Sequence, residues 1–369
     1  MRVFRACLLL WSLMAALALA LPAQAERIVA VGDLHGDFAA WRAIARDAGL
    51  VDARGRWRGG HTILVQMGDI ADRGPDTLRI ARDLMRLQRE AARAGGRVHV
   101  LVGNHEAMNM TGDLRYVTPA EFAAFADAGS AGRRERILAA NEAAIVAAAR
   151  ARDPQRPVEE IRREWLARTP LGWVEHRLAW SPQGEIGRWV IANPAVLVIG
   201  DTLFVHAGLS AAHAARTPAQ INAAVAAALA ARDDGETAII NDPDGPLWYR
   251  GLVMERAAPA PAAAAAGDAA AVAAAPPLPP ATGERAPPPP PPRTPAAELE
   301  RVLAAQGVRR MVVGHTPSLS GIRLLHDGRL AMVDTGISAS YGGRLSWLEI
   351  RDGVLVAHHP ERPAPAAAR

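Results

Sequence analysis

The chain has 369 residues, half of them apolar, which is enough to bury the core of one large domain. Its formal net charge is +4, every basic side chain is an arginine, and the arginines alternate with acids along predicted helices. This pattern is typical of solvated helix faces, and without an aromatic-and-basic cluster it argues against a nucleic-acid partner. The single cysteine, Cys7, excludes a disulfide framework.

The N-terminus has the three parts of a secretory signal. Arg2 and Arg5 precede an apolar run over 7–21, and Pro22 with the small residues of Ala23-Gln24-Ala25 ends it. The run is shorter than the about 20 apolar residues of a membrane-spanning helix. We therefore expect cleavage after Ala25, a periplasmic or secreted protein, and no stable insertion into a membrane.

Five apolar runs end in residue types that bind metals, four of them directly after a glycine. The runs are 28–31, 63–67, 98–102, 203–205 and 311–313, and the residues that follow are Asp33, His35, Asp69, Asn104, His206 and His315. In open α/β sheets, ligands bind in the crevice beyond the carboxyl ends of the strands. Gathered there, these oxygen and nitrogen ligands suffice for two divalent ions, and the set suits Mn, Fe or Zn.

The order of strands and helices predicts an α/β fold. Asp37 is expected to cap a helix with Trp41 and Ile44 on its apolar face, and a second helix is expected to open at Pro75. Alternating strands and helices up to residue 102 indicate a mostly parallel sheet. Two later hairpins, turned at 200–201 and 352–353, predict a second sheet with antiparallel strands.

The expected metal-binding domain spans residues 26–360 and contains two additions. Residues 111–190 are predicted to form a helical insertion, whose tryptophans we assign to its core. Residues 257–296 are almost entirely Ala and Pro, which predicts a linker loop, with a helix restarting at Thr294 and Pro295. Residues 361–369 predict a disordered tail.

The order of short motifs resembles a known family. The chain contains "GDLHG", "GDIADRG", "GNHE", "HAG" and "GHTP", which look like the ordered signature of PPP-type metallophosphatases within the calcineurin-like metallophosphoesterases. Three longer segments are similar to the narrower Shewanella-like protein phosphatases, namely "GNHEAMNMTGDLRYVTPAEF", "GPLWYRG" and "VDTGIS". The resemblance implies a metallophosphoesterase fold, in which two mixed β-sheets are sandwiched between helices (αββα).

The resemblance and the residue types together assign the two metals. Asp33, His35 and His315 are expected to bind the first ion. Asp69 is expected to bridge the two ions, and Asn104 and His206 are expected to complete the second site. Two ions about 3.5 to 4 Å apart would bridge a hydroxide, lower its pKa and position it for in-line attack on phosphorus.

The resemblance also implies the remaining roles. His105 is expected to act as the general acid, and Asp72 to orient it and raise its pKa. Arg73, Arg250 and Tyr341 are expected to contact the phosphate. Glu106 is expected to accept backbone hydrogen bonds rather than to bind metal.

The sequence therefore predicts a dinuclear-metal phosphatase acting on phosphomonoesters of proteins, phosphotyrosine among them, or on small phosphoesters. The alternatives are a nucleotide or dinucleoside polyphosphate hydrolase and a metal-binding module without activity; the presence of His105, Asp72 and Arg73 argues against the last. No regulatory subunit is expected, because the C-terminal loop lacks the cysteine-containing segment of the eukaryotic branch.

Overall fold

The computed structural model describes residues 26–254 and 294–362. The predicted signal peptide, residues 255–293 of the Ala/Pro-rich region and the last seven residues lie outside the described residues. Among the helices that are described, none is both long and apolar enough to cross a membrane.

The first sheet has five strands in the order β10-β9-β1-β2-β3. The strands are β1 (Ile28–Val31), β2 (Ile63–Gln66), β3 (Arg97–Val100), β9 (Trp347–Arg351) and β10 (Val354–His358). β1, β2 and β3 are parallel, with Ile28 opposite Ile63 and Ile63 opposite Arg97. The β9–β10 hairpin adds to the edge of β1 in antiparallel register, so the sheet is mixed, as expected.

The second sheet has the order β4-β5-β6-β8-β7. Its strands are β4 (Val196–Ile199), β5 (Thr202–Val205), β6 (Arg310–Val313), β7 (Arg323–Leu325) and β8 (Leu330–Met332). β5, β6 and β8 are parallel, whereas β4 and β7 close the two edges in antiparallel register. The metal-ligand segments after β5 and β6 therefore leave the sheet at the same end.

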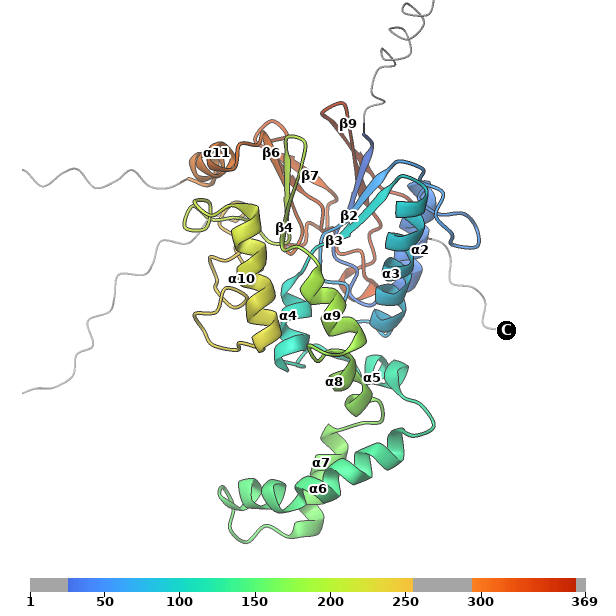
Figure 1. Cartoon of the computed structure of the whole chain (residues 1–369), viewed down its shortest axis with the longest axis vertical. Coiled ribbons are helices and arrows are strands. Elements are labelled where there is room, and N and C mark those ends of the chain that lie inside the picture. Colours follow the sequence, from blue (N-terminus) through green and yellow to red (C-terminus); the bar gives the residue numbers. More distant parts are fainter. Residues whose placement is uncertain (1–25, 255–293, 363–369) are drawn as a thin grey trace, which may run out of the picture.

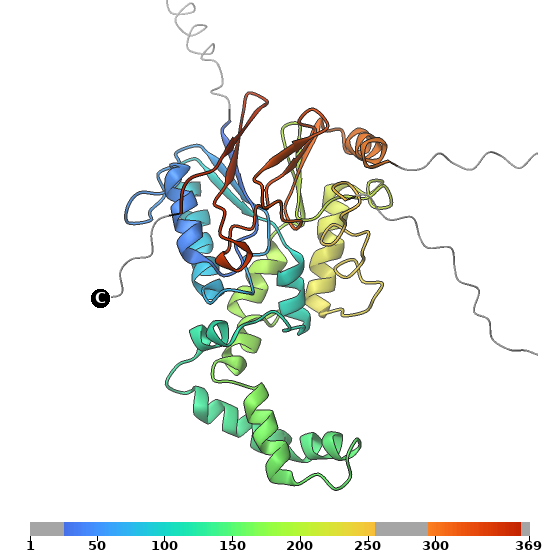
Figure 2. The same cartoon turned by 180° about the vertical axis from the view of Figure 1, so that it is seen from behind.

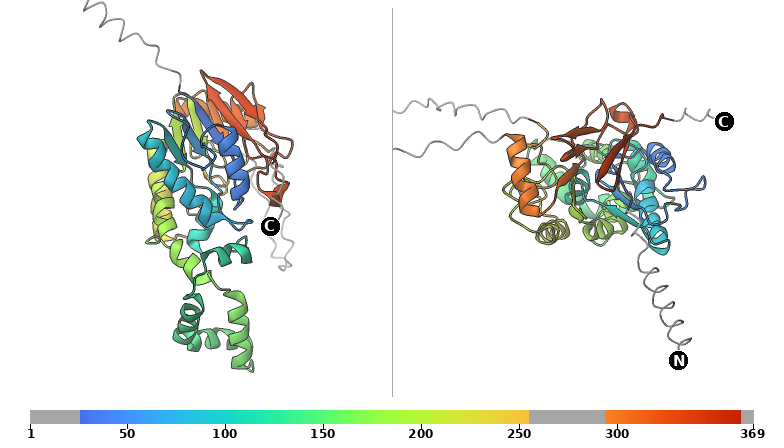
Figure 3. Two further views of the ribbon diagram at one scale, coloured as in Figure 1. Left: turned by 90° about the vertical axis from the view of Figure 1, so that its right-hand side faces the viewer. Right: turned by 90° about the horizontal axis from the view of Figure 1, so that it is seen from above.

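The two sheets pack face to face between layers of helices (Figures 1 and 3). Ala30, Val65, Phe204 and Val312 lie in the core between the sheets. On the outer face of the first sheet lie α2 (Phe38–Asp47) and α3 (Thr77–Arg93), whose apolar stripes include Trp41. On the second sheet lie α10 (Pro218–Ala231) and α11 (Pro295–Gln306). The αββα architecture implied by the resemblance is confirmed.

The helical insertion begins after α4 (Asn104–Thr111) and extends away from the two sheets (Figures 1 and 2). It contains α5 (Pro119–Phe125), α6 (Ser130–Arg150), α7 (Val158–Arg168), α8 (Trp173–Ala179) and α9 (Glu185–Ala192). α5 contacts α3, and α9 contacts α10, so both ends of the insertion rest on the two-sheet body. Of its tryptophans, Trp180 is fully buried, while Trp165, Trp173 and Trp189 are partly buried.

The helix boundaries largely follow the sequence signals. The Asp37 side chain accepts a hydrogen bond from Ala40 N at the start of α2. Thr294 caps α11, and Pro295 is its first residue, so the last two residues of the predicted linker belong to this helix. The helix expected to open at Pro75 instead begins at Thr77, because Asp76 is its N-cap. In the predicted tail, Arg362 binds the Asp37 carboxylate at 2.8 Å.

Candidate active site

All six predicted metal ligands are buried and converge where the strands of both sheets end. Asp33 and His35 follow β1, and Asp69 follows β2; Asn104 opens α4 after β3. His206 and His315 follow β5 and β6 in the second sheet. The site therefore lies across the junction of the two sheets, and it cannot form from either sheet alone.

Asp69 is the centre of this cluster. Its Oδ2 lies 3.9 Å from His35 Nε2 and 3.8 Å from His105 Nε2, and its Oδ1 lies 3.4 Å from His206 Nε2. His35, Asp69 and His105 form one group whose ligand atoms lie within 4.8 Å of one another; Asp69, His206 and His315 form another. A carboxylate shared by two such groups is the arrangement required of a bridging ligand.

His315 does not lie with the metal ligands that the sequence grouped it with. Its ligand atom groups with Asp69 and His206, rather than with His35. Only its backbone approaches the first group, where His315 N donates to Asp33 Oδ1 and Oδ2 at 3.2 and 3.1 Å. The prediction that His315 returns to the first metal therefore does not match the geometry, because β6 pairs directly with β5 and brings both histidines to one side.

Backbone hydrogen bonds fix the orientation of the histidines. His35 Nδ1 lies 2.9 Å from Ala71 O, and His206 Nδ1 lies 2.8 Å from Met67 O. For His35, donation from Nδ1 leaves Nε2 with a lone pair towards the cluster. His206 Nε2 faces Asn104 Oδ1 at 3.0 Å. Burial lowers the pKa of His206, but the Asp69 carboxylate outweighs it and leaves the pKa raised. Burial lowers the pKa of His35 to about 3 and that of His315 to about 2, so both are neutral. Neutral imidazole is the form that binds metal.

The charges in the cluster also fit divalent cations. Burial, together with the nearby carboxylates of Asp334 and Asp69, raises the pKa of Asp33 well above its usual value. Burial likewise raises the pKa of Asp334 to about 6. Crowded, buried carboxylates are costly to ionise unless a cation neutralises them. His315 Nε2, moreover, is buried without a hydrogen-bond partner. The donor set thus fits metal ions.

Two motif glycines allow the ligand loops to approach this closely. A Cβ atom on Gly103 would lie 2.2 Å from Asp69 Oδ1, and one on Gly314 would lie 2.5 Å from Asp33 Oδ1. Any larger residue would displace a metal ligand. The local backbone is strained as well, since five of the nine described non-glycine residues with positive φ belong to the site: His35, Asp69, Asp72, Arg73 and His315.

His105 is held by a buried network. Its Nδ1 lies 2.5 Å from Asp72 Oδ2, and its backbone N donates to Asp69 Oδ1 at 3.0 Å. Asn109 Nδ2 donates to Asp72 Oδ1 and to His105 O, both at 2.9 Å. Burial lowers the pKa of His105, but the carboxylates of Asp69 and Asp72 outweigh it and leave the pKa raised. The network thus favours a protonated imidazole with Nε2 towards the cluster.

Glu106 holds two loops together, those after β2 and β3, by accepting backbone hydrogen bonds, as expected from the sequence. Its carboxylate accepts hydrogen bonds from Asp69 N and Gly103 N at 2.8 Å and from Ile70 N at 2.9 Å. Consecutive residues of α4 therefore have different tasks, with Asn104 and His105 facing the cluster and Glu106 holding the loop that carries Asp69.

Arg73 lies between two tyrosines at the rim. Its Cζ is 4.5 Å from the centroid of the Tyr116 ring and 4.8 Å from that of Tyr341. Arg73 forms no ion pair with another described residue, and its Nε is buried without a partner. Cation–π contacts thus hold the guanidinium without neutralising it, which leaves it available to an anion.

These groups line a cavity of about 90 Å³. Arg250 and Tyr341, the other two residues predicted to contact the phosphate, line it together with Arg73 and His105. Arg250 is exposed and lies near His315, with Nη2 3.4 Å from His315 O. Two arginines and an imidazole around so small a space can bind the oxygens of one tetrahedral anion.

The sequence reasoning missed four residues of the site. Asp334, Tyr116 and Trp248 also line the cavity, and Asn109 supports Asp72. Asp334 could have been found, because it follows β8 directly and thus repeats the pattern of an apolar run ending in a carboxylate. Asn109 could have been found only by recognising α4, which places it one turn after His105.

Comparison with known proteins agrees with this geometry. A family model described as calcineurin-like phosphoesterase matches residues 26–319. Shewanella-like protein phosphatase 2 of Arabidopsis thaliana is 34% identical over 332 residues, which cover 88% of this chain and 75% of that protein. The chain belongs to the Shewanella-like protein phosphatases of the calcineurin-like family. As a member, it is a hydrolase acting on phosphoesters.

Other similarities to this Shewanella-like phosphatase are partial or concern the fold. Shewanella-like protein phosphatase 1 of Plasmodium berghei is 39% identical over 99 residues, 27% of each chain. The cold-active protein-tyrosine phosphatase of a psychrophilic Shewanella species is 22% identical in sequence to this chain, and its crystal structure matches the fold with a TM-score of 0.58. The match covers 90% of this chain and 77% of that one. At this identity the likeness shows a shared fold.

Proposed function

We propose that the protein is a dinuclear-metal phosphatase that hydrolyses phosphomonoesters of proteins, phosphotyrosine among them. The observation that carries the proposal is the position of His105: it is held by Asp72 and lines the same cavity as Asp69 and Arg73. A proton donor, a shared carboxylate and an unpaired arginine around one small cavity are the groups that phosphoester hydrolysis requires.

The metal set would be held by Asp33, His35, Asp69, Asn104, His206 and His315, and its mixed ligands suit Mn, Fe or Zn. When bound, two such ions supply an activated water and neutralise phosphoryl charge. Arg73 and Arg250 bind the phosphoryl oxygens from the rim. His105 donates the proton from Nε2 to the leaving oxygen, while Asp72 stabilises the imidazolium.

The names of similar proteins support a phosphoprotein substrate over a dinucleotide. The cavity of about 90 Å³ has room for little more than a phosphoryl group, whether the rest of the substrate is a peptide or a nucleoside. The leaving group must therefore lie outside, across the tyrosine rim of Tyr116 and Tyr341. The Arabidopsis relative is named a protein phosphatase, and the Shewanella structure a protein-tyrosine phosphatase; both names favour the same substrate class.

Turnover of three substrates side by side tests the proposal. Phosphotyrosine peptide, phosphoserine peptide and a dinucleoside tetraphosphate are compared with added Mn²⁺, using kcat/KM as the readout. We expect both peptides to be hydrolysed faster than the dinucleotide, with phosphotyrosine preferred. A higher kcat/KM for the dinucleotide would replace this proposal with the nucleotide alternative.

We also propose that the mature protein begins at Glu26 and is periplasmic or secreted, on the basis of the signal-like residues 1–25. Mass spectrometry of the protein recovered from the periplasm or medium of a host cell tests this directly. An uncleaved N-terminus, or recovery only from the cytoplasm, would contradict it.

A further inference from the structure

A long groove runs between α2 and α3 on the outside of the molecule. Two hollows, of about 540 and 760 Å³, share five lining residues and are therefore continuous: Phe38, Asp76, Arg79, Asp83 and Arg86. We call this surface the α2–α3 groove. It also includes the loop that follows α2, through Arg54 and Arg56.

The α2–α3 groove is basic. Seven arginines line it against three acids, Asp76, Asp83 and Glu90. Two of the arginines pair with acids just outside this lining, Arg56 with Asp52 and Arg82 with Glu185. With these two acids counted, the groove keeps an excess of two positive charges, which can attract an anionic partner.

Two of the three acids of the groove, Asp83 and Glu90, are already engaged, whereas Asp76 forms no ion pair within the described residues. Arg86 lies 2.5 Å from Asp83 and 2.6 Å from Glu90, and Arg42 lies 3.6 Å from Asp83. Asp83 also accepts a hydrogen bond from Trp41 Nε1 at 2.9 Å. These contacts neutralise two arginines and fix both acids to the groove floor.

Three exposed arginines remain without a carboxylate partner. Arg46 donates only to Ala53 O, and the Arg79 guanidinium lies 3.8 Å from the centre of the Phe38 ring. For Arg46, Arg54 and Arg79, no ion pair with any residue in the described ranges is formed. Unpaired guanidinium groups bind carboxylates in a bidentate, planar geometry.

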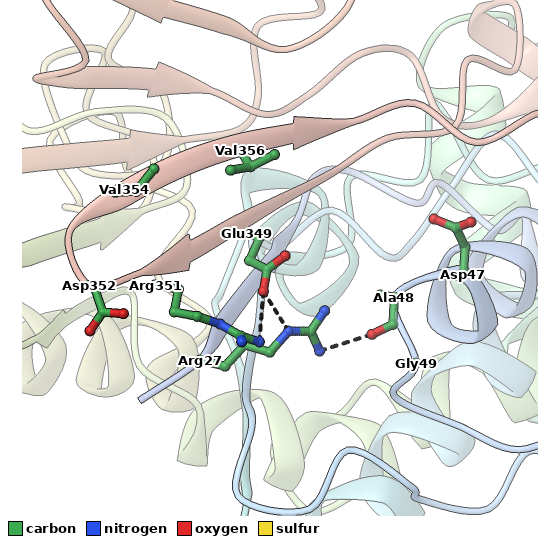
Figure 4. A pocket seen from close by; sticks show the side chains of 9 residues that line it. All are labelled: Arg27, Asp47, Ala48, Gly49, Glu349, Arg351, Asp352, Val354 and Val356. Atoms are coloured by element: carbon green, nitrogen blue, oxygen red, sulfur yellow. Dashed lines mark hydrogen bonds and ion pairs between the residues drawn. The ribbon is translucent and has the colours of Figure 1, made fainter. Parts of the chain in front are cut away.

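A second large hollow provides a contrast. It measures about 790 Å³ and lies beside the β9–β10 hairpin (Figure 4). Its arginines are paired internally, since Arg27 and Arg351 both contact the Glu349 carboxylate, at 2.8 and 3.0 Å. Unpaired arginines, as in the α2–α3 groove, are therefore not found in every hollow of the described surface.

The groove begins beside the active site. α2 and α3 start directly after the loops that carry His35 and Arg73, and Asp76 N donates to Gly36 O at 3.0 Å. Phe38 follows Asp37, whose Oδ2 accepts from Ala339 N near the cavity residue Tyr341. The ten residues of α2 extend about 15 Å from there, a length that about five residues of extended peptide span.

We propose that the α2–α3 groove binds an acidic segment flanking the phosphorylated residue of the protein substrate. This assignment rests on the proposed phosphoprotein phosphatase function. Carboxylates spaced along an extended chain would meet Arg79 near the active site and Arg46 and Arg54 farther away. Nucleic acid fits less well: its bases require open aromatic faces, and both Arg79 and Arg42 already lie over the Phe38 ring.

Binding of a fluorescent peptide that carries five glutamates and no phosphate tests the groove without catalysis. The full-length protein is compared with Arg46→Glu/Arg79→Glu. The matched control is Arg301→Glu/Arg323→Glu, at two exposed arginines of α11 and β7 beside the second sheet. We expect roughly a tenfold weaker affinity in the groove variant only. Equal losses of affinity in both variants would show that only the net charge of the protein matters, and would overturn the proposal. Tighter binding of single-stranded DNA than of the peptide to the groove would overturn it as well.

Kinetics then connect the groove to the substrate. The readout is the ratio of kcat/KM for a phosphopeptide with an acidic extension to kcat/KM for the same peptide with a neutral one. This ratio should exceed one in the wild type and fall to about one in the groove variant, while the control variant keeps the wild-type ratio. A wild-type enzyme that turns over neither peptide would contradict the proposed function; active enzyme with a ratio of one would contradict only the groove.

Discussion

His105 Nδ1 lies 2.5 Å from Asp72 Oδ2, and this contact leaves the other ring nitrogen, Nε2, facing the cavity. The carboxylate is fully buried, so its charge is not screened by water. An imidazole held in this way is both oriented and inclined to carry a proton.

Replacing His105 by Asn should separate chemistry from binding. Asn keeps a polar side chain of similar reach but supplies no proton at neutral pH. General-acid catalysis typically contributes about 10² to 10⁴-fold, so kcat should fall by about that factor. Steady-state kinetics with phosphoserine peptide measure the loss, and metal analysis should show unchanged stoichiometry.

The dependence on the leaving group is the sharper test of this role. Aryl phosphates whose phenol has a low pKa need little protonation, so His105→Asn should slow them less than alkyl phosphates. The same loss across leaving groups of widely different pKa would mean that His105 has another function.

Asp69→Ala should lower metal content and activity together. Asp69 is the one residue shared by both groups of ligand atoms, so its loss affects each group. We expect both metal stoichiometry, measured by plasma emission spectroscopy, and turnover to fall. Asp234→Ala, at an exposed position outside the cluster, serves as the control. Two metals per chain in the Asp69 variant would refute the bridging assignment.

Asn109→Ala should act through Asp72 rather than on the substrate. The change removes the amide that donates to Asp72 Oδ1 and His105 O, which loosens the carboxylate without touching the cavity. We expect kcat to fall by about tenfold, with KM and metal content retained and with a larger loss for poor leaving groups. A rise in KM at constant kcat would show that Asn109 supports binding instead.

The buried His176 should make the protein sensitive to acid. Burial among Phe122, Phe125 and Trp180 lowers its pKa to about 3, so it stays neutral in the folded state. The unfolded chain takes up a proton below the ordinary pKa of 6.5. Stability is therefore lost as the pH falls from 6.5 towards 3, by up to about 1.4 kcal/mol per pH unit.

His176→Phe should remove this contribution, since a phenyl ring suits the same aromatic contacts. Urea unfolding at about pH 7 and about pH 5 measures the free energy of unfolding of both proteins. The wild type should lose more stability than the variant between the two values. Equal losses would show that His176 gains a proton without unfolding.

The Ala/Pro-rich segment should be dispensable for chemistry. Residues 257–293 have no apolar periodicity that could bury a core. We expect a short Gly/Ser replacement that keeps Thr294, the cap of α11, to leave turnover of a small aryl phosphate and the Tm unchanged. A marked fall in Tm would show that the segment packs on the domain.

The ligand positions could be predicted because strand ends are local signals. An apolar run, a glycine and then a polar residue specify a buried strand that delivers its next side chain to the sheet edge, and this holds for Asp33, Asp69 and His315. The resemblance added the roles of His105 and Asp72. Together they grouped His315 with the first metal, whereas its ligand atom lies with Asp69 and His206, since that grouping depends on which strands become neighbours.

The missed residues depend on contacts between distant elements. Tyr116 reaches the cavity because the loop after α4 turns back, where Arg73 N donates to Tyr116 O at 3.0 Å. The charge of the α2–α3 groove was also hidden: along the sequence the arginines of α3 read as ordinary i,i+4 partners, and Arg86 and Glu90 do pair in that way. Only the packing of α2 beside α3 shows which guanidinium groups remain unpaired.

The pairing of β1 with both β2 and β9 has a consequence for biosynthesis. Ile28 lies opposite Ile63 but also opposite Ile350, and Asp33 meets the backbone of His315. Contacts between such distant residues form slowly and late. A nascent chain halted before residue 315 would already contain five of the six ligands, but it would lack β8 and β9, which pair with β6 and β1. We therefore expect metal loading to follow the completion of synthesis.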